Sequence, residues 1–290
     1  MSLKIEKYPS VLGAEVSGVP LAGLEDREVL AALRAGMEEH AVLVFRDQPL
    51  TSEQQLAFAQ AFDGALHSKT STAALGNNRF GNDALTDISN TSADGSILPA
   101  DDRRRMNSIA NRLWHTDASF QDPPGRFSLL SAQTIPSMRA DTEFADMRAA
   151  YDALEPAEKA ALEGLRVFHS IAYSREVMGF KFLDGEKETL KGAVHPLVRV
   201  LPSGRRSLYL ASHAQEILEM PVPEGRLLLR DLLEHATQRR FVHQHEWRVN
   251  DLVIWDNRTT MHRARPFDDK KHRRELRRTT TLDLPATSLA

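Results

Sequence analysis

The chain has 290 residues, 41% of them hydrophobic, and a formal net charge of -3 with histidine counted as neutral. This composition can supply a packed core and argues against nucleic-acid binding. The absence of cysteine excludes disulfides, thiolate zinc sites, iron–sulfur clusters and cysteine nucleophiles. Any metal must therefore be held by histidine and carboxylate side chains.

Apolar runs are short throughout the chain. None approaches the roughly 20 residues of a membrane span, and Met1–Lys7 lack the apolar core of a secretion signal. We therefore expect a cytoplasmic protein that contacts no membrane. We find no internal repeat, low-complexity tract or linker, which predicts one domain spanning residues 1–290.

The N-terminal part predicts scaffold elements. Apolar spacing and turn residues predict a strand within 11–22, a helix over 25–39, a strand over 41–45 and a helix over 51–62. Thr51 and Gln54 have the spacing of a capping box at the start of the last helix.

Two stretches predict lids. Residues 63–111 are rich in Gly, Asn, Ser and Asp and contain one convincing strand, over 84–89. Residues 168–192 form a second irregular stretch. Loops of this length are usually functional or disordered. Since the first runs directly into a candidate metal motif, we expect a lid over the metal.

The remaining elements are mostly strands with helices between them. We expect strands over 127–132, 141–147, 206–210, 241–249, 251–255, 259–264 and 275–282, and helices over 147–154, 156–164 and 224–238. No βαβ repeat is present. The order predicts a mainly β fold with flanking helices, built on an antiparallel double-sheet roll.

The segment His115-Thr116-Asp117 is the candidate metal motif. Residues two apart on a strand point to the same face, so this His and Asp could bind one ion. Two histidines and one carboxylate leave three positions open on iron(II), and His262 is our candidate for the second histidine. By itself, each of these residues could equally be structural.

The C-terminal strand is rich in arginine. Arg274 and Arg278 are four apart and share a strand face with Leu276, which predicts a carboxylate site, because the guanidinium fork binds carboxylates through two hydrogen bonds. For Arg273 and Arg277, on the opposite face, we expect a solvated edge strand. Arg273 is the next candidate if the register is shifted by one residue.

Other interpretations remain open from these residues. His243 and His245 also share a strand face, but they lack a carboxylate partner in any motif we identify. A metal-dependent hydrolase or isomerase on a related roll would use the metal to activate water. It would leave the predicted carboxylate site at Arg274 without a purpose. A nonenzymatic roll would not need an intact set of metal ligands.

Taken together, the motifs resemble those of the iron(II)/2-oxoglutarate dioxygenases of the taurine dioxygenase family. The resemblance rests on the segments His115-Thr116-Asp117, Asp141-Thr142, Trp255-Asp256-Asn257-Arg258, His262 and the Arg-rich strand, and on the long separation of Asp117 from His262. Within the family, residues 41–50, 141–154, 223–237 and 273–283 look most like the 2,4-dichlorophenoxyacetate (aryloxyalkanoate) branch. The resemblance implies a double-stranded β-helix, or jelly-roll, core.

The resemblance also implies roles for individual residues. His115, Asp117 and His262 would bind Fe(II). Thr142 and Arg274 would bind the distal carboxylate of the co-substrate 2-oxoglutarate, and O2 would be the second co-substrate. The residues expected to line the substrate pocket are Arg278, Asn111, Lys69, His213 and His67. Arg139-Ala140 stand where many relatives carry two glycines, and residues 63–78 match poorly.

The implied reaction is hydroxylation of a small anionic substrate, with succinate and CO2 as co-products. An aryloxyacetate hydroxylated beside its ether oxygen would collapse to a phenol and glyoxylate. The alternative within the family is a taurine, alkylsulfonate or alkyl sulfate dioxygenase. We also expect a homo-oligomer.

Overall fold

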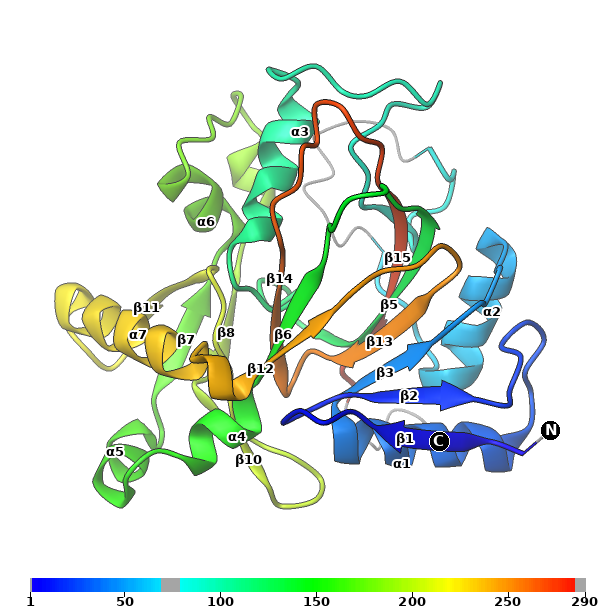
Figure 1. Ribbon diagram of the computed structural model, residues 1–290. Coiled ribbons are helices and arrows are strands. Elements are labelled where there is room, and N and C mark those ends of the chain that lie inside the picture. The colour runs from blue at the N-terminus through cyan, green and yellow to red at the C-terminus, as the bar shows by residue number, and fades with distance from the viewer. Residues whose placement is uncertain (1, 69–78, 285–290) are drawn as a thin grey trace.

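The computed structural model describes residues 2–68 and 79–284 (Figure 1). A seven-stranded sheet with the order β1-β2-β3-β13-β5-β15-β4 forms its largest part. These strands are β1 (Lys4–Lys7), β2 (Ala14–Ser17), β3 (Val42–Phe45), β13 (Leu252–Asp256), β5 (Gly125–Thr134), β15 (Glu275–Leu282) and β4 (Thr86–Asp87). All pairs are antiparallel except β2 with β3.

Three smaller sheets complete the β-structure. One has the order β12-β6-β14, with β12 (Val242–His245), β6 (Thr142–Asp146) and β14 (Thr260–Ala264). The others pair β11 (Ala214–Ile217), β7 (Arg166–His169) and β8 (Ala193–Pro196), and β10 (Arg206–Leu208) with β9 (Val198–Val200).

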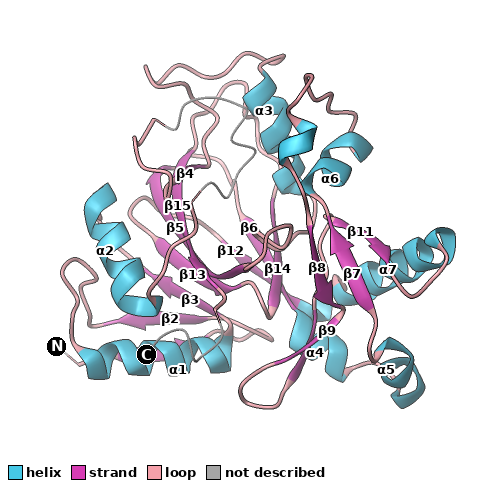
Figure 2. Cartoon of the chain, turned by 180° about the vertical axis from the view of Figure 1, so that it is seen from behind, coloured by secondary structure: helices cyan, strands magenta, loops and turns pink. Residues whose placement is uncertain are grey.

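Helices surround these sheets, so the fold is mixed α/β. They are α1 (Arg27–His40), α2 (Ser52–Asp63), α3 (Arg103–Ser108), α4 (Met147–Asp152), α5 (Pro156–Leu162), α6 (Ile171–Val177) and α7 (Val222–Ala236). Short 3-10 helices cover Ile109–Arg112, Lys187–Thr189 and Arg239–Phe241. In Figure 2, α1 and α2 lie on the same side of the molecule as β2 and β3, away from α5 and α7.

The central strands of the large sheet, such as β3 and β13, are buried on both faces. On one face, apolar side chains of β3, β5 and β13 pack with those of α1 and α2. The other face packs against β6 of the small sheet, where Phe144 contacts Trp255 at 5.5 Å between ring centroids. Fully apolar strands such as Val42–Phe45 fit this position, because only a strand covered on both faces loses its polar alternation.

Local signals in the scaffold are confirmed. The Thr51–Gln54 capping box opens α2, and the Asp26 side chain caps α1 by accepting from the backbone N–H groups of Glu28 and Val29. Such caps satisfy backbone donors that have no partner within the helix.

Four expectations need correction. His115 forms an isolated bridge and Asp117 begins a turn, so the metal motif is not part of a regular strand. Residues 168–192 are not wholly irregular, because they contain the end of β7 and all of α6. The strand expected over 84–89 is reduced to β4. Finally, β15 is not an edge strand, since it pairs with both β5 and β4.

No described helix has the length and apolar character that crossing a membrane requires.

Candidate active site

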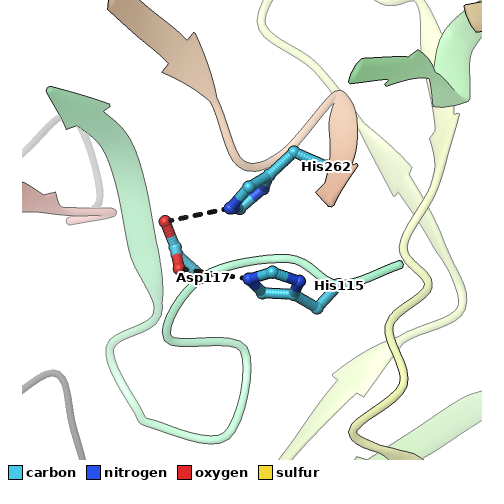
Figure 3. A group of neighbouring side chains, drawn as sticks. All are labelled: His115, Asp117 and His262. Carbon is cyan, nitrogen blue, oxygen red and sulfur yellow. Dashed lines mark ion pairs between the residues drawn. The ribbon is translucent and has the colours of Figure 1, made fainter. Parts of the chain in front are cut away.

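His115, Asp117 and His262 converge at one point, where their side chains face one another (Figure 3). Their candidate ligand atoms all lie within 4.8 Å of one another. The Nε2 atom of His115 is 3.9 Å from Asp117 Oδ1, and that of His262 is 3.7 Å from Asp117 Oδ2. In the described part of the chain, this is the one group of three or more potential metal ligands.

Backbone pairing holds the two histidines together. The His115 N–H donates to the His262 carbonyl at 3.0 Å, and the His262 N–H donates to the His115 carbonyl at 2.8 Å. The hydroxyl of Thr116 donates to the Leu210 carbonyl at 2.9 Å. A tertiary bridge, rather than the alternation of a strand, thus brings the motif to His262.

The protonation states suit a divalent metal. Burial lowers the pKa of both His115 and His262, which favours the neutral imidazole that binds metals. The His115 Nδ1 atom lies 2.8 Å from the Leu113 carbonyl, so Nδ1 carries the proton and Nε2 is left as ligand. For Asp117, burial acts to raise the pKa, but the positive charge of Arg278, with smaller contributions from neighbours that include the Ser128 hydrogen bond, outweighs it and lowers the pKa. The residues therefore fit a two-histidine, one-carboxylate iron site.

A chain of hydrogen bonds orients Asp117. Ser128 Oγ donates to Asp117 Oδ2 at 2.8 Å and accepts from Asn257 Nδ2 at 2.9 Å. Asn257 Oδ1 accepts from the Asp117 backbone N–H at 3.2 Å and from Trp255 Nε1 at 3.0 Å. The sequence reasoning noted the Trp255–Arg258 motif but missed this role, and nothing local to Ser128 signalled its own.

A small cavity brings six of the predicted site residues together. Its lining includes Asn111, His115, Thr142, His262, Arg274 and Arg278. The other lining residues are Ile88, Leu130, Trp255 and Ala264, all apolar or aromatic. A few converging polar groups in an apolar wall are typical of a ligand site.

One end of this cavity suits a carboxylate. The Thr142 hydroxyl accepts from Trp247 Nε1 at 3.0 Å, and its own proton can be donated to a ligand. Burial lowers the pKa of Arg274 to about 10, opposed by Asp141, and its Nε atom has no hydrogen-bond partner among the described residues. Asn90 fixes the Arg274 backbone by accepting from its N–H at 2.8 Å. A buried guanidinium beside a free hydroxyl donor fits the distal carboxylate of 2-oxoglutarate.

Arg278 lies beside the metal ligands. Its Nη1 atom donates to Asp117 Oδ1, and its side chain is buried. Arg274, and not Arg273, lines the cavity. The Arg273 side chain is half exposed, and its Nη2 atom lies 2.9 Å from Glu275 Oε1.

Other predicted residues lie near the cavity or outside the described chain. His213 does not line it; its Nδ1 atom lies 2.9 Å from Ser174 Oγ, and its ring packs edge-on against His115 at 6.1 Å. His67 is buried, and its backbone N–H donates to the Thr280 carbonyl. Lys69 lies outside the described residues.

The alternative histidine pair has other partners. His245 Nε2 lies 3.3 Å from Asp251 Oδ2, and the His243 ring stacks on Tyr8 at 4.9 Å. The two side chains are therefore not joined in a metal group, since the group formed by His115, Asp117 and His262 is the one found among the described residues.

Comparison with known proteins decides the family. A family model described as "Taurine catabolism dioxygenase TauD, TfdA family" matches residues 4–280. The chain belongs to the TauD/TfdA family of dioxygenases.

Relatives of this TauD/TfdA dioxygenase are similar to it over nearly the whole chain. The α-ketoglutarate-dependent 2,4-dichlorophenoxyacetate dioxygenase of Cupriavidus pinatubonensis is 46% identical, covering 90% of this chain and 94% of its own. The (S)-phenoxypropionate/α-ketoglutarate dioxygenase of Delftia acidovorans is 36% identical, covering 93% and 91%. The crystal structure of AAD-2 in complex with Mn(II) and N-oxalylglycine is 44% identical, covers 98% of both chains and has a TM-score of 0.88.

The chain is thus an α-ketoglutarate-dependent dioxygenase with a His-Asp-His metal triad. This confirms the predicted family, enzyme class and co-substrate. It also rules out the hydrolase and nonenzymatic interpretations.

Proposed function

We propose that this dioxygenase acts on aryloxyalkanoates and cleaves an aryloxyacetate ether to a phenol and glyoxylate. The observation that carries the proposal is the small cavity, whose wall includes two of the three metal ligands, His115 and His262, together with Thr142, Arg274 and Arg278. Relatives named for 2,4-dichlorophenoxyacetate and phenoxypropionate support the substrate class.

The proposed roles follow from position. His115, Asp117 and His262 hold the iron. Thr142 and Arg274 bind the distal carboxylate of 2-oxoglutarate, one through a hydroxyl donor and the other through its charge. Arg278, near the triad, holds the anionic head of the substrate, while Asn111 shapes the space around it from the cavity wall and His213 packs against His115.

When bound, the iron and 2-oxoglutarate supply the oxidising chemistry that inserts one oxygen atom of O2 into a C–H bond, releasing succinate and CO2. The protein's residues supply placement. A carboxylate held by Arg278 sets the adjacent methylene group beside the triad, because Arg278 donates to Asp117 itself. Hydroxylation of that carbon gives a hemiacetal, which loses the phenol and leaves glyoxylate.

The wall around the triad is suited to an aryl ether. Leu130, Ile88 and Trp255 are apolar or aromatic cavity residues, and Trp255 lies 4.6 Å from the His262 ring. Taurine would instead need polar acceptors for its ammonium group.

The test is a substrate screen with purified enzyme, Fe(II) and 2-oxoglutarate. We expect phenoxyacetate and 2,4-dichlorophenoxyacetate to stimulate O2 consumption and to release phenol and succinate in equal amounts. The (R)- and (S)-phenoxypropionates, taurine and alkyl sulfates are measured in parallel. Sulfite release from taurine without stimulation by any aryloxyalkanoate would contradict the proposal.

A second candidate stays within the family. The alkylsulfatase of Acinetobacter baylyi is 30% identical to this chain, in a match that covers 90% of this chain and 80% of the alkylsulfatase. A sulfate or sulfonate group could replace the carboxylate at Arg278, because both are anions that guanidinium binds. The alkyl sulfate arm of the screen distinguishes it by release of sulfate and an aldehyde.

The proposal includes the architecture around the site. We propose that the large sheet and the β12-β6-β14 sheet are the two halves of a double-stranded β-helix, in one domain with lids over 63–111, of which 69–78 lie outside the described residues, and over 168–192. The packing of Phe144, in the small sheet, against Trp255, in the large sheet, supports this. Limited proteolysis with and without N-oxalylglycine tests the lids, since ligand should protect both stretches.

We also propose a cytoplasmic homo-oligomer. Lack of cysteine supports a reducing compartment. The exposed apolar side chains of Leu218, Val222 and Leu227, at and near the start of α7, support self-association. Light scattering of the purified protein gives the oligomeric state, and a Leu227→Asp variant should lower it.

A further inference from the structure

Arg175 is a buried cation that the reaction described above does not use. It lies in α6 and is 6% exposed. Its Nε atom donates to Asn107 Oδ1 at 3.0 Å, and its Nη1 atom donates to Ser174 Oγ at 3.1 Å. Both acceptors are neutral, and across residues 2–68 and 79–284 the guanidinium has no acidic group among its charged neighbours.

The position of Arg175 connects it to the metal site. Ser174 Oγ, which accepts from Arg175, also lies 2.9 Å from His213 Nδ1, and the His213 ring packs edge-on against His115. Asn107 belongs to α3, and the following 3-10 helix carries Asn111, a residue of the cavity wall. Arg175 therefore approaches the triad from helical elements, whereas Arg274 and Arg278 approach it from the β15 segment.

The charges around Arg175 are one-sided. Burial, together with the positive charge of Arg278, lowers the pKa of Arg175 to about 10. The group is still charged at neutral pH, so it is a like-charged neighbour of Arg278, which lines the cavity. Burying a cation without an anion is unfavourable, and a bound anion would offset both charges.

Other buried arginines differ in this respect. Arg148 pairs with Asp146, and Arg258 pairs with Asp256. Arg277 has three neutral hydrogen-bond acceptors and, in addition, the favourable charge of Glu53. Among the described residues, Arg175 has two neutral acceptors, and its charged neighbour is another arginine.

We propose that Arg175 is a second cationic contact for the carboxylate of the organic substrate, shared with Arg278, and that it determines the preference for anionic substrates. The inference rests on the proposed aryloxyalkanoate activity and adds a residue to it. Arg274 remains assigned to 2-oxoglutarate, so the two carboxylates are bound by different arginines.

The first test is Arg175→Gln, which keeps hydrogen-bonding capacity and removes the charge. We expect the KM for phenoxyacetate to rise about 30-fold or more, while the KM for 2-oxoglutarate changes less than about threefold. Inhibition by the neutral analogue phenoxyacetamide should be unchanged, because it has no charge to pair. A merely structural role for Arg175 would weaken the acid and the amide alike.

Two variants keep the inference testable if Arg175→Gln folds poorly. Arg175→Lys retains the charge and should recover part of the affinity for phenoxyacetate. Asn107→Asp would place a carboxylate on Arg175, which should stabilise the protein and still raise the KM for phenoxyacetate about tenfold or more, since the internal anion competes with the substrate.

The matched control is Arg277→Gln, which removes a buried arginine on the far side of β15. It should lower the melting temperature without changing the KM for phenoxyacetate. An unchanged KM in both Arg175→Gln and Asn107→Asp would overturn the inference while the proposed function stands. Absence of aryloxyalkanoate turnover in the parent enzyme would instead overturn both.

Discussion

Strand β15 presents the same residue type to two different environments. Arg278, on the face toward the small sheet, lies at the metal site and contacts Asp117. Arg277, on the opposite face, contacts α2 and the segment before it, where Gln55 Oε1, Ser52 Oγ and the Leu50 carbonyl accept its protons at 2.8–3.0 Å. The two arginines are buried to a similar extent, but Arg278 lines the cavity and Arg277 does not.

This contrast corrects an expectation from sequence. Arg277 is 5% exposed, so it does not lie on a solvated edge. Gln55 also donates through Nε2 to the carbonyls of Leu129 and Arg277, joining α2 to β5 and β15. One face of the strand thus joins the strand to α2, and the other lines the cavity at the metal triad. Substitutions should separate these effects.

The largest effect is expected at the metal triad. His115→Ala, Asp117→Ala and His262→Ala should each abolish turnover and leave the far-UV circular dichroism unchanged, because each removes one of three protein ligands. Iron content after dialysis and O2 consumption are the measurements. Full activity in any of the three would remove the residue from the site.

Arg274→Ala should weaken the binding of 2-oxoglutarate by about 2–5 kcal/mol, since the distal carboxylate loses its charged partner. Arg274→Lys should rescue poorly, because an ammonium cannot form the bidentate fork. The readout is the KM for 2-oxoglutarate in succinate formation.

Arg273→Ala is the matched control for this change, since half of that side chain is exposed. It should alter neither co-substrate KM nor stability by more than about 0.5 kcal/mol. If Arg273→Ala raised the KM for 2-oxoglutarate and Arg274→Ala did not, the arginine register would be shifted by one residue.

Arg277→Ala should act on stability alone. The substitution leaves acceptors on Gln55, Ser52 and Leu50 without their donor, which should lower the free energy of unfolding by about 2–3 kcal/mol. Urea denaturation measures this loss. A changed KM for 2-oxoglutarate in the folded variant would show that the two faces of β15 are coupled.

The smallest effect is expected at Ser128, which orients a metal ligand from behind. Ser128→Ala removes the hydrogen bond to Asp117 Oδ2 and leaves Asn257 Nδ2 without an acceptor. Iron affinity should fall about tenfold, measured by titration under anaerobic conditions. Ser128→Thr keeps a hydroxyl and serves as the control; equal iron affinity in the alanine variant and the parent would exclude the orienting role.

Much of the local structure could be predicted because its causes are local. The Thr51–Gln54 capping box needs only neighbouring residues, and the apolar run of β3 follows from burial on both faces. The positions of His115, Asp117 and His262 in one metal group could be predicted because their residue types and order match the motifs of the family.

Contacts between distant residues could not be predicted in this way. The bridge between His115 and His262, the Ser128–Asn257 support of Asp117, and the burial of Arg277 under α2 each join segments far apart in the sequence. No propensity or spacing encodes them, since they arise only when the sheets pack.

The sequence by itself determined the chemistry of this protein: histidine and carboxylate for a metal, and arginine for carboxylates, in an order typical of one family. The tertiary structure decided the surroundings of each arginine. Arg274, Arg277 and Arg175 have the same guanidinium, and their differences come from surroundings built by packing: a cavity wall, a set of neutral acceptors, and a like-charged neighbour. A charge acquires its function from the dielectric and partners around it, and those exist only in the folded chain.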